Sequence, residues 1–242
     1  MYFLLDSNVT AAYYLPRSTK YKKVQDRIEI IFDSVRSGKS NHFFYIPNFC
    51  IAEVFSVFMK HSFETWNKHL KNKNTINTKV YNSLVKQFSE DIHNGKFLYH
   101  FELNRYHILG INLIAPIDHY YKISKSKQKQ VVPAGTFDHL IISMGINLAH
   151  FHGPENVCII SSDDRLIEIL KKCKSKISKS TINKLKLNVA EEVTGKPFGP
   201  DIFPGHLNLK TATKKELEEI FNFWPLEVGN LPYKVYRWTK LK

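Results

Sequence analysis

Short apolar runs mark the strands that this sequence predicts. Tyr2–Leu5 and Val157–Ile160 are unbroken runs of apolar residues, a pattern typical of strands buried on both faces. Phe43–Ile46 is a further strand candidate. The sequence therefore predicts at least these three buried strands.

Between and after these runs, apolar residues recur at three- and four-residue spacing, which places them on one face of an amphipathic helix. Three such sets are Val24, Ile28, Ile31 and Val35; Ile51, Val54, Phe55 and Phe58; and Leu140, Ile141, Met144 and Leu148. Strand and helix patterns thus alternate along the chain. This alternation predicts an α/β fold, with a parallel sheet and helices packed on it.

The region 61–130 follows a different pattern. It contains one more amphipathic helix but no run typical of a buried strand, so we expect a largely helical insertion. The apolar positions of that helix are Val80, Leu84, Phe88 and Ile92. Later in the chain, Thr213–Glu216 forms a capping box that predicts a short helix through Ile220. We expect a domain over 1–172, with a basic C-terminal extension over 173–242 packed on or beside it.

Positive charge dominates the composition, with a formal net charge of +13 and a pI of about 9.5. Such an excess favours polyanionic partners, although a Lys-rich soluble surface explains it equally well. Two runs without acids stand out: Lys122–Lys129, expected as a surface loop, and Lys171–Lys186. We predict that both contact the phosphate backbone of a nucleic acid. The candidate lysines are Lys125, Lys127, Lys129, Lys171, Lys172 and Lys174.

The cysteines and the apolar stretches bear on the compartment. Cys50, Cys158 and Cys173 have no paired spacing, so the sequence predicts neither a disulfide framework nor a zinc site, and a reducing cytoplasm fits. The N-terminus reaches a charge at Asp6, too early for a secretory signal. The apolar stretch Phe49–Met59 is shorter than the roughly 20 residues that cross a bilayer. We therefore expect a cytoplasmic protein without a membrane partner.

Four acidic residues stand at the junctions of the predicted elements. Asp6 follows the first strand, Asp138 opens a helix and Asp163 follows a later strand, so each could simply stabilise a helix N-terminus. Glu53 is harder to explain, because it lies within an apolar helix, where an uncompensated buried carboxylate is strongly unfavourable. Either a protein cation or a site shared with the three aspartates would hold it.

A shared site would lie where ligands gather in an open parallel sheet, outside the carboxyl ends of the strands. Clustered carboxylates repel one another, so their presence implies bound cations or raised pKa values. Hard oxygen ligands select Mg²⁺ or Mn²⁺. These ions activate water and stabilise charge on a phosphodiester, a chemistry that suits a basic chain.

In the context of these four acids the sequence resembles the PIN-domain family. Members carry an Asp after the first strand, a Glu within an early helix, an Asp opening a later helix, and a Ser/Thr-x-Asp after a following strand. The matching segments occur here in the same order, and the resemblance covers 1–59 and 131–170. These segments are Phe3–Val9, Ile46–Val54, Phe137–Ile142 and Ile160–Asp163.

The resemblance implies a PIN-like three-layer sandwich and a metal-dependent endoribonuclease that uses Mg²⁺ or Mn²⁺ and attacks with water. By this resemblance the catalytic metal-binding residues would be Asp6, Glu53, Asp138 and Asp163, with Asp164 as a further carboxylate and with Asn8 and Ser161 as supporting hydrogen-bonding residues. The chain is larger than the compact toxins of the family, which puts a toxin role in doubt.

Two alternatives stay open. The chain could be a catalytically silent nucleic-acid-binding module, or a nuclease that cuts DNA flaps or single strands. The presence of all four acids favours an enzyme, because a module without catalysis has no need to tolerate carboxylate repulsion. We expect a nucleic acid partner, RNA first, and leave open both an antitoxin-like protein partner and a homodimer.

Overall fold

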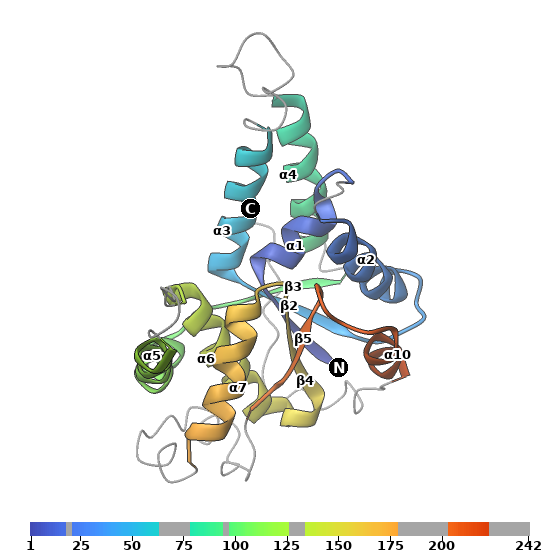
Figure 1. The fold of residues 1–242 in the computed structure, drawn as a ribbon. Coiled ribbons are helices and arrows are strands. Elements are labelled where there is room, and N and C mark those ends of the chain that lie inside the picture. The colour runs from blue at the N-terminus through green and yellow to red at the C-terminus, as the bar shows by residue number, and fades with distance from the viewer. Residues whose placement is uncertain (18–20, 63–77, 94–96, 126–133, 179–202, 223–242) are drawn as a thin grey trace.

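A five-stranded parallel sheet forms the centre of the protein, with the strand order β3-β2-β1-β4-β5 (Figure 1). The computed structural model describes all residues except 18–20, 63–77, 94–96, 126–133, 179–202 and 223–242, and leaves out the side chains of 121–125 and 221–222. The strands are β1 (Tyr2–Leu5), β2 (Phe43–Pro47), β3 (Leu98–Phe101), β4 (Val157–Ser161) and β5 (Gly205–Asn208).

Two groups of helices cover the sheet. α1 to α4 contact one another, whereas α5, α6 and α7 form a second contacting group (Figure 1). The bounds are α1 (Ser7–Tyr14), α2 (Lys22–Arg36), α3 (Asn48–Lys60), α4 (Thr78–His93), α5 (Arg105–Lys125), α6 (Thr136–His152), the 3₁₀ turn η2 (Pro154–Asn156), α7 (Asp164–Lys176) and α10 (Lys214–Asn222). The α/β fold expected from the alternating pattern is confirmed.

The central strands are buried because they are apolar at nearly every position. All residues of β1 and β4 are buried, as expected for strands with helices on both faces. α6 lies close to β4, since a Cβ added at Gly145 would stand only 2.6 Å from Cδ1 of Ile159. A larger residue at this point of the helix would require the side chain of Ile159 or the helix itself to shift.

The sheet is wider than the sequence pattern predicts. β3 lies inside the region 61–130 that we expected to contain no strand, and it pairs with β2 in parallel. β5 belongs to the expected C-terminal extension, and it pairs with β4. Both are edge strands with partly exposed residues, so their sequences are more polar than those of the buried strands. The extension thus contributes to the same sheet as the rest of the chain.

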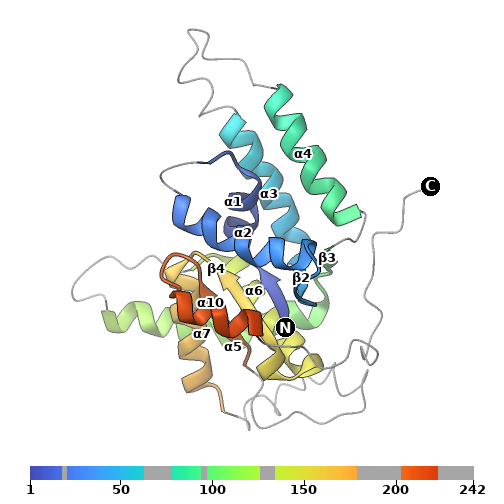
Figure 2. The ribbon, with the colours of Figure 1, turned by 90° about the vertical axis from the view of Figure 1, so that its right-hand side faces the viewer.

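Some helical predictions are corrected in detail. α5 continues to Lys125, so the first part of the basic run Lys122–Lys129 is helical and not a loop, while its remainder lies outside the described residues. The capping box is confirmed: the Glu216 carboxylate accepts from the Thr213 N–H, and the Glu216 N–H donates to the Thr213 hydroxyl. α3 and α4 run side by side and extend beyond the sheet (Figure 2).

Two further observations concern the helices and the cysteines. Among the described residues, no helix is both long and apolar enough to cross a membrane. Cys50, Cys158 and Cys173 are all buried, and none forms a disulfide.

Candidate active site

The candidate site lies where the strand order reverses. From β1 the chain proceeds outward to β2 and β3, and it then returns to the other side of β1 to form β4 and β5. In open parallel sheets, this switch point is where ligands bind, outside the carboxyl ends of the strands. Asp6 directly follows β1, and its N–H donates to the carbonyl of Ile160 in β4 at 3.0 Å. Asp6 is thereby fixed at the junction of the two central strands.

Asp6 is held by short hydrogen bonds in a buried position. Its side chain is nearly inaccessible, and its Oδ2 accepts from the Ser161 hydroxyl and from Nδ2 of Asn8, both at 2.6 Å. Asp6 occupies the N-cap position of α1, but its side chain makes no capping hydrogen bond. Helix capping therefore does not explain this aspartate.

The surroundings of Asp6 disfavour its charged form. The pKa of this carboxyl is raised from 3.8 to about 7: burial is the main cause, the charges of Asp138, Glu53 and Asp163 add to it, and the hydrogen bond from Ser161 opposes it. The four acids that are far apart in the sequence therefore share one electrostatic neighbourhood in the fold.

Asp138 and Asp163 do serve as helix caps, as the simpler explanation predicts. Oδ2 of Asp138 accepts from the Gly135 N–H at 2.9 Å, and Oδ1 of Asp163 accepts from the Arg165 N–H at 2.7 Å. In each carboxylate, the second oxygen accepts no hydrogen bond from any residue that the structure describes. Capping thus fixes these side chains and leaves one oxygen of each for another ligand.

The pKa of Asp138 is also raised. Burial is the main cause, and the charges of Asp163 and Glu53 add to it, whereas the hydrogen bond from Gly135 and the charge of His139 oppose it. Asp138 is therefore close enough to both acids to be affected by their charge.

Glu53 is half-buried and not enclosed in the core, which corrects the expectation of a fully buried carboxylate. It lies in the second turn of α3, which directly follows β2. Within the described part of the chain, no basic side chain forms an ion pair with it and no donor hydrogen-bonds to it. Of the two alternatives, a protein cation is thus not found among these residues, and the charge of Glu53 affects Asp6 and Asp138.

The four carboxylates do not converge on one point. In the part of the chain that the structure describes, no three His, Cys, Asp or Glu side chains are arranged so that they could hold a metal ion. The aspartates are oriented by their caps and by Ser161, and mutual repulsion of like charges favours their separation. As placed, the acids share a region without forming a coordination shell.

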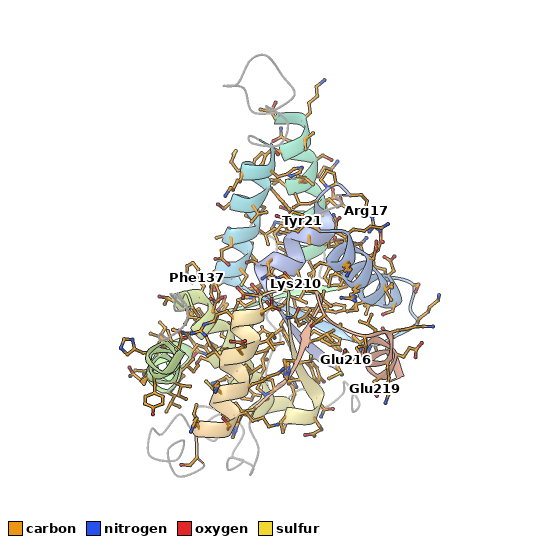
Figure 3. The ribbon with its side chains drawn as sticks, in the orientation of Figure 1. Arg17, Tyr21, Phe137, Lys210, Glu216 and Glu219 are labelled. Carbon is orange, nitrogen blue, oxygen red and sulfur yellow. The ribbon has the colours of Figure 1, made fainter. Side chains whose placement is uncertain are left out.

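Asp164 has partners of its own. Its carboxylate accepts from Nδ2 of Asn208, the last residue of β5, at 2.6 Å, and it pairs with Nζ of Lys210 at 3.3 Å; Lys210 is labelled in Figure 3. The structure therefore gives the fifth predicted carboxylate a separate set of partners.

Asn8 and Ser161 connect the two loops that carry Asp6 and Asp163. Oδ1 of Asn8 accepts from the Ser162 N–H at 3.0 Å, and the Ser161 hydroxyl oxygen accepts from the Asp163 N–H at 2.8 Å. Both residues also donate to Asp6. They hold the ends of β1 and β4 in a fixed relation.

A buried polar network behind the site was not predicted from the sequence. Asp118 of α5 is almost completely buried; its Oδ2 lies 3.1 Å from Nε2 of His139 and accepts from the Ala134 N–H at 2.9 Å. Its Oδ1 forms an ion pair with Arg165. His139 follows Asp138, and the Arg165 N–H donates to Asp163, so the network positions the starts of α6 and α7. The one sign of this network in the sequence is Asp118 itself, an acid within an apolar stretch of α5.

The lysines expected to bind nucleic acid are separated from the acids. Lys171, Lys172 and Lys174 are exposed on the second half of α7, roughly 10 to 15 Å along the helix from its start at the site. Lys127 and Lys129 lie outside the described residues, and Lys125 is the last residue of α5. The structure does not bring the described lysines of α7 into the group of acids.

Comparisons with known proteins found a distant similarity to a solved structure. No family model matches the chain, and no curated protein matches it significantly. Among solved structures, the chain is similar to the crystal structure of VapBC2 from Rickettsia felis bound to a DNA fragment from their promoter. The match has 15% identity and a TM-score of 0.37, and it covers 70% of this chain and 93% of that chain. The resemblance to the PIN-domain family therefore rests on the chain's own features, a parallel α/β sheet and four acids in the expected order near its carboxyl edge.

Proposed function

We propose that this protein is a metal-dependent nuclease that hydrolyses phosphodiester bonds, with RNA as its substrate. The observation that carries the proposal is the environment of Asp6, a buried carboxyl at the switch point whose pKa is raised to about 7 in the company of three further acids. Strongly perturbed acids in such a position are typical of functional sites. An aspartate with only a structural role would gain no stability from three neighbouring acids.

The donor chemistry fits a divalent cation. Carboxylate oxygens are the ligands that Mg²⁺ and Mn²⁺ prefer, and a cation would offset the repulsion among the acids. The residues that would hold it are Asp6, Glu53, Asp138 and Asp163. A bound cation of this kind would lower the pKa of a water molecule and neutralise charge on a phosphodiester.

The chain's own residues prepare the site for this chemistry. Hydrogen bonds from Ser161 and Asn8 hold the Asp6 carboxyl in place. Asp138 and Asp163 are held by the capping hydrogen bonds that they accept from backbone N–H groups. The latter two stand at the first turns of α6 and α7, where the positive end of the helix dipole favours negative charge. The net charge of +13 favours the approach of a polyanion.

A nucleic-acid-binding module without turnover is the second candidate. It is favoured by one observation: the described acids are not arranged to hold a metal ion. A nuclease acting on DNA flaps or single strands uses the same donors, so the choice of RNA over DNA comes from the family resemblance alone. The sequence left open a homodimer and an antitoxin-like protein partner, and neither is part of this proposal.

Incubation of the full chain with labelled RNA and DNA separates these candidates. The nuclease should cut RNA in Mn²⁺ but not in EDTA, and Asp6→Asn should reduce the rate by at least about a hundredfold, in the range seen when a key group of a site is removed. Asp33→Asn, which removes an exposed acid on α2, serves as the matched control and should cut like the wild type. Binding without cleavage would support the silent module, and cleavage of DNA alone would overturn the choice of RNA.

A further inference from the structure

A pair of stacked aromatic rings lies at the rim of the candidate site. Phe49, in the first turn of α3, and Phe137, in the first turn of α6, have ring centroids 5.1 Å apart and ring planes inclined by 16°. Phe49 precedes Glu53 by one helical turn, and Phe137 directly precedes Asp138. The ring pair thus joins the two helices that carry two of the proposed metal-binding acids. Phe137 is labelled in Figure 3.

The exposure of Phe137 is not explained by packing. Its side chain is 46% exposed and lies outside the hydrophobic core, whereas Phe49 is half-buried and packs against that core. Phe49 therefore anchors the pair and holds the outer ring in place. A large apolar ring kept in water beside a group of acids gains little for the fold, because much of its surface stays hydrated.

We propose that Phe137, supported by Phe49, is a stacking platform for an unpaired nucleobase of the bound strand. The inference rests on the proposed nuclease function and adds a residue that contacts the substrate. Every base presents an aromatic face, so stacking on a phenyl ring requires no particular sequence. In a double helix both faces of each base are already covered by neighbouring bases, which excludes them from the platform.

The position of the platform suits this role. Phe137 stacks on Phe49, which lies one helical turn before Glu53, so a base on the ring would be bound beside the start of the two helices that carry Glu53 and Asp138. The positive net charge favours binding of the backbone as a whole, and the ring adds an apolar contact that the backbone cannot make. Affinity for a single strand should therefore depend on the ring, and its salt dependence should not.

Fluorescence anisotropy with a labelled single-stranded oligonucleotide in EDTA tests the platform apart from cleavage. We expect Phe137→Ala to weaken binding by roughly 5- to 100-fold, and Phe137→Trp to retain it. Phe137→Leu keeps an apolar group but cannot stack, so it should behave like the alanine variant. Tyr120→Ala, which removes a 71% exposed aromatic on α5, is the control and should bind like the wild type. Thermal melts of all four variants establish that they fold.

The same measurement with a duplex of identical sequence decides the outcome. Wild type and Phe137→Ala should bind the duplex equally, and the salt slope for the single strand should be unchanged, because every cation that faces phosphate is still present. Equal single-strand binding by both proteins, as for a ring that docks a protein partner, would overturn the inference. An equal loss for single strand and duplex would overturn it too. Because cleavage is measured separately in Mn²⁺, an inactive protein would refute the nuclease proposal without removing this binding result.

Discussion

The buried carboxyl of Asp6 predicts that the metal-free protein loses stability as the pH rises. Its pKa is raised from 3.8 to about 7, first by burial and then by the neighbouring acids. The folded state therefore binds this proton more tightly than the unfolded chain does. Asp6 contributes stability that is fully present below about pH 4 and is lost as the pH rises through about 7.

The size of the effect follows from the pKa difference. A rise of about three units corresponds to about 4 kcal/mol, at about 1.36 kcal/mol per unit. The unfolded chain already ionises this carboxyl above pH 4, so roughly 2 to 3 kcal/mol of the total falls between pH 5 and pH 8.5. Asp6→Asn removes the titrating group but keeps an oxygen that accepts from Ser161 and Asn8. The variant should lack this part of the pH dependence.

Urea unfolding in EDTA at pH 5 and pH 8.5 measures the difference. Relative to the wild type, Asp6→Asn should gain roughly 2 to 3 kcal/mol in the free energy of unfolding between the two pH values. Asp33→Asn removes an exposed charge and should follow the wild type at both. Parallel behaviour of Asp6→Asn and wild type would mean that the folded protein ionises this carboxyl without penalty, and the electrostatic account of the site would be wrong.

Three further predictions concern the acids, the buried network and the lysines. Asp163→Asn keeps the helix cap but should lose Mn²⁺-dependent cleavage and most of the rise in melting temperature that Mn²⁺ causes in the wild type, whereas Asp164→Asn should retain both. An equal loss in the two variants would mean that Asp164 belongs to the site. Asp118→Ala should lower the free energy of unfolding, measured in urea titrations, by about 3 kcal/mol, because the charge of Arg165 loses its buried partner. A loss below about 1 kcal/mol would mean that water replaces the carboxylate. Changing the three lysines of 171–174 to Gln should make the binding constant for nucleic acid less dependent on salt: the slope of its logarithm against log salt should fall by about 0.7 to 0.9 for each phosphate that is no longer neutralised. An unchanged slope would exclude this helix from the nucleic acid interface.

The sequence predicts the centre of the fold well because burial determines the residue types there. β1 and β4 are apolar at nearly every position, and the three- and four-residue spacing in α2, α3 and α6 follows from packing one face on the sheet. Asp6 and Asp163 are recognisable because strand-to-helix junctions are short and place these residues at a known edge. The order of the acids therefore carries information that composition does not.

The parts that the sequence does not predict depend on partners far along the chain. β3 is short, and His100 and partial exposure obscure its strand pattern, so only its pairing with β2 defines it. Asp118 reads as a single acid in an apolar helix, because its partners His139 and Arg165 are 21 and 47 residues away. The separate partners of Asp164 likewise depend on β5, which the turn-rich sequence around it does not indicate.

The strands that carry the proposed chemistry are neighbours in the middle of the sheet. Asp6 follows β1, Asp163 follows β4, and the helix with Glu53 follows β2, whereas the edge strands β3 and β5 carry none of the four acids. Both edges come from chain outside the segments that resemble the PIN-domain family. Segments added beyond either edge strand can therefore change the size and outline of the molecule without displacing the central strands. The inserted region is not independent of the centre in every part, because its Asp118 binds His139 and Arg165 at the starts of α6 and α7.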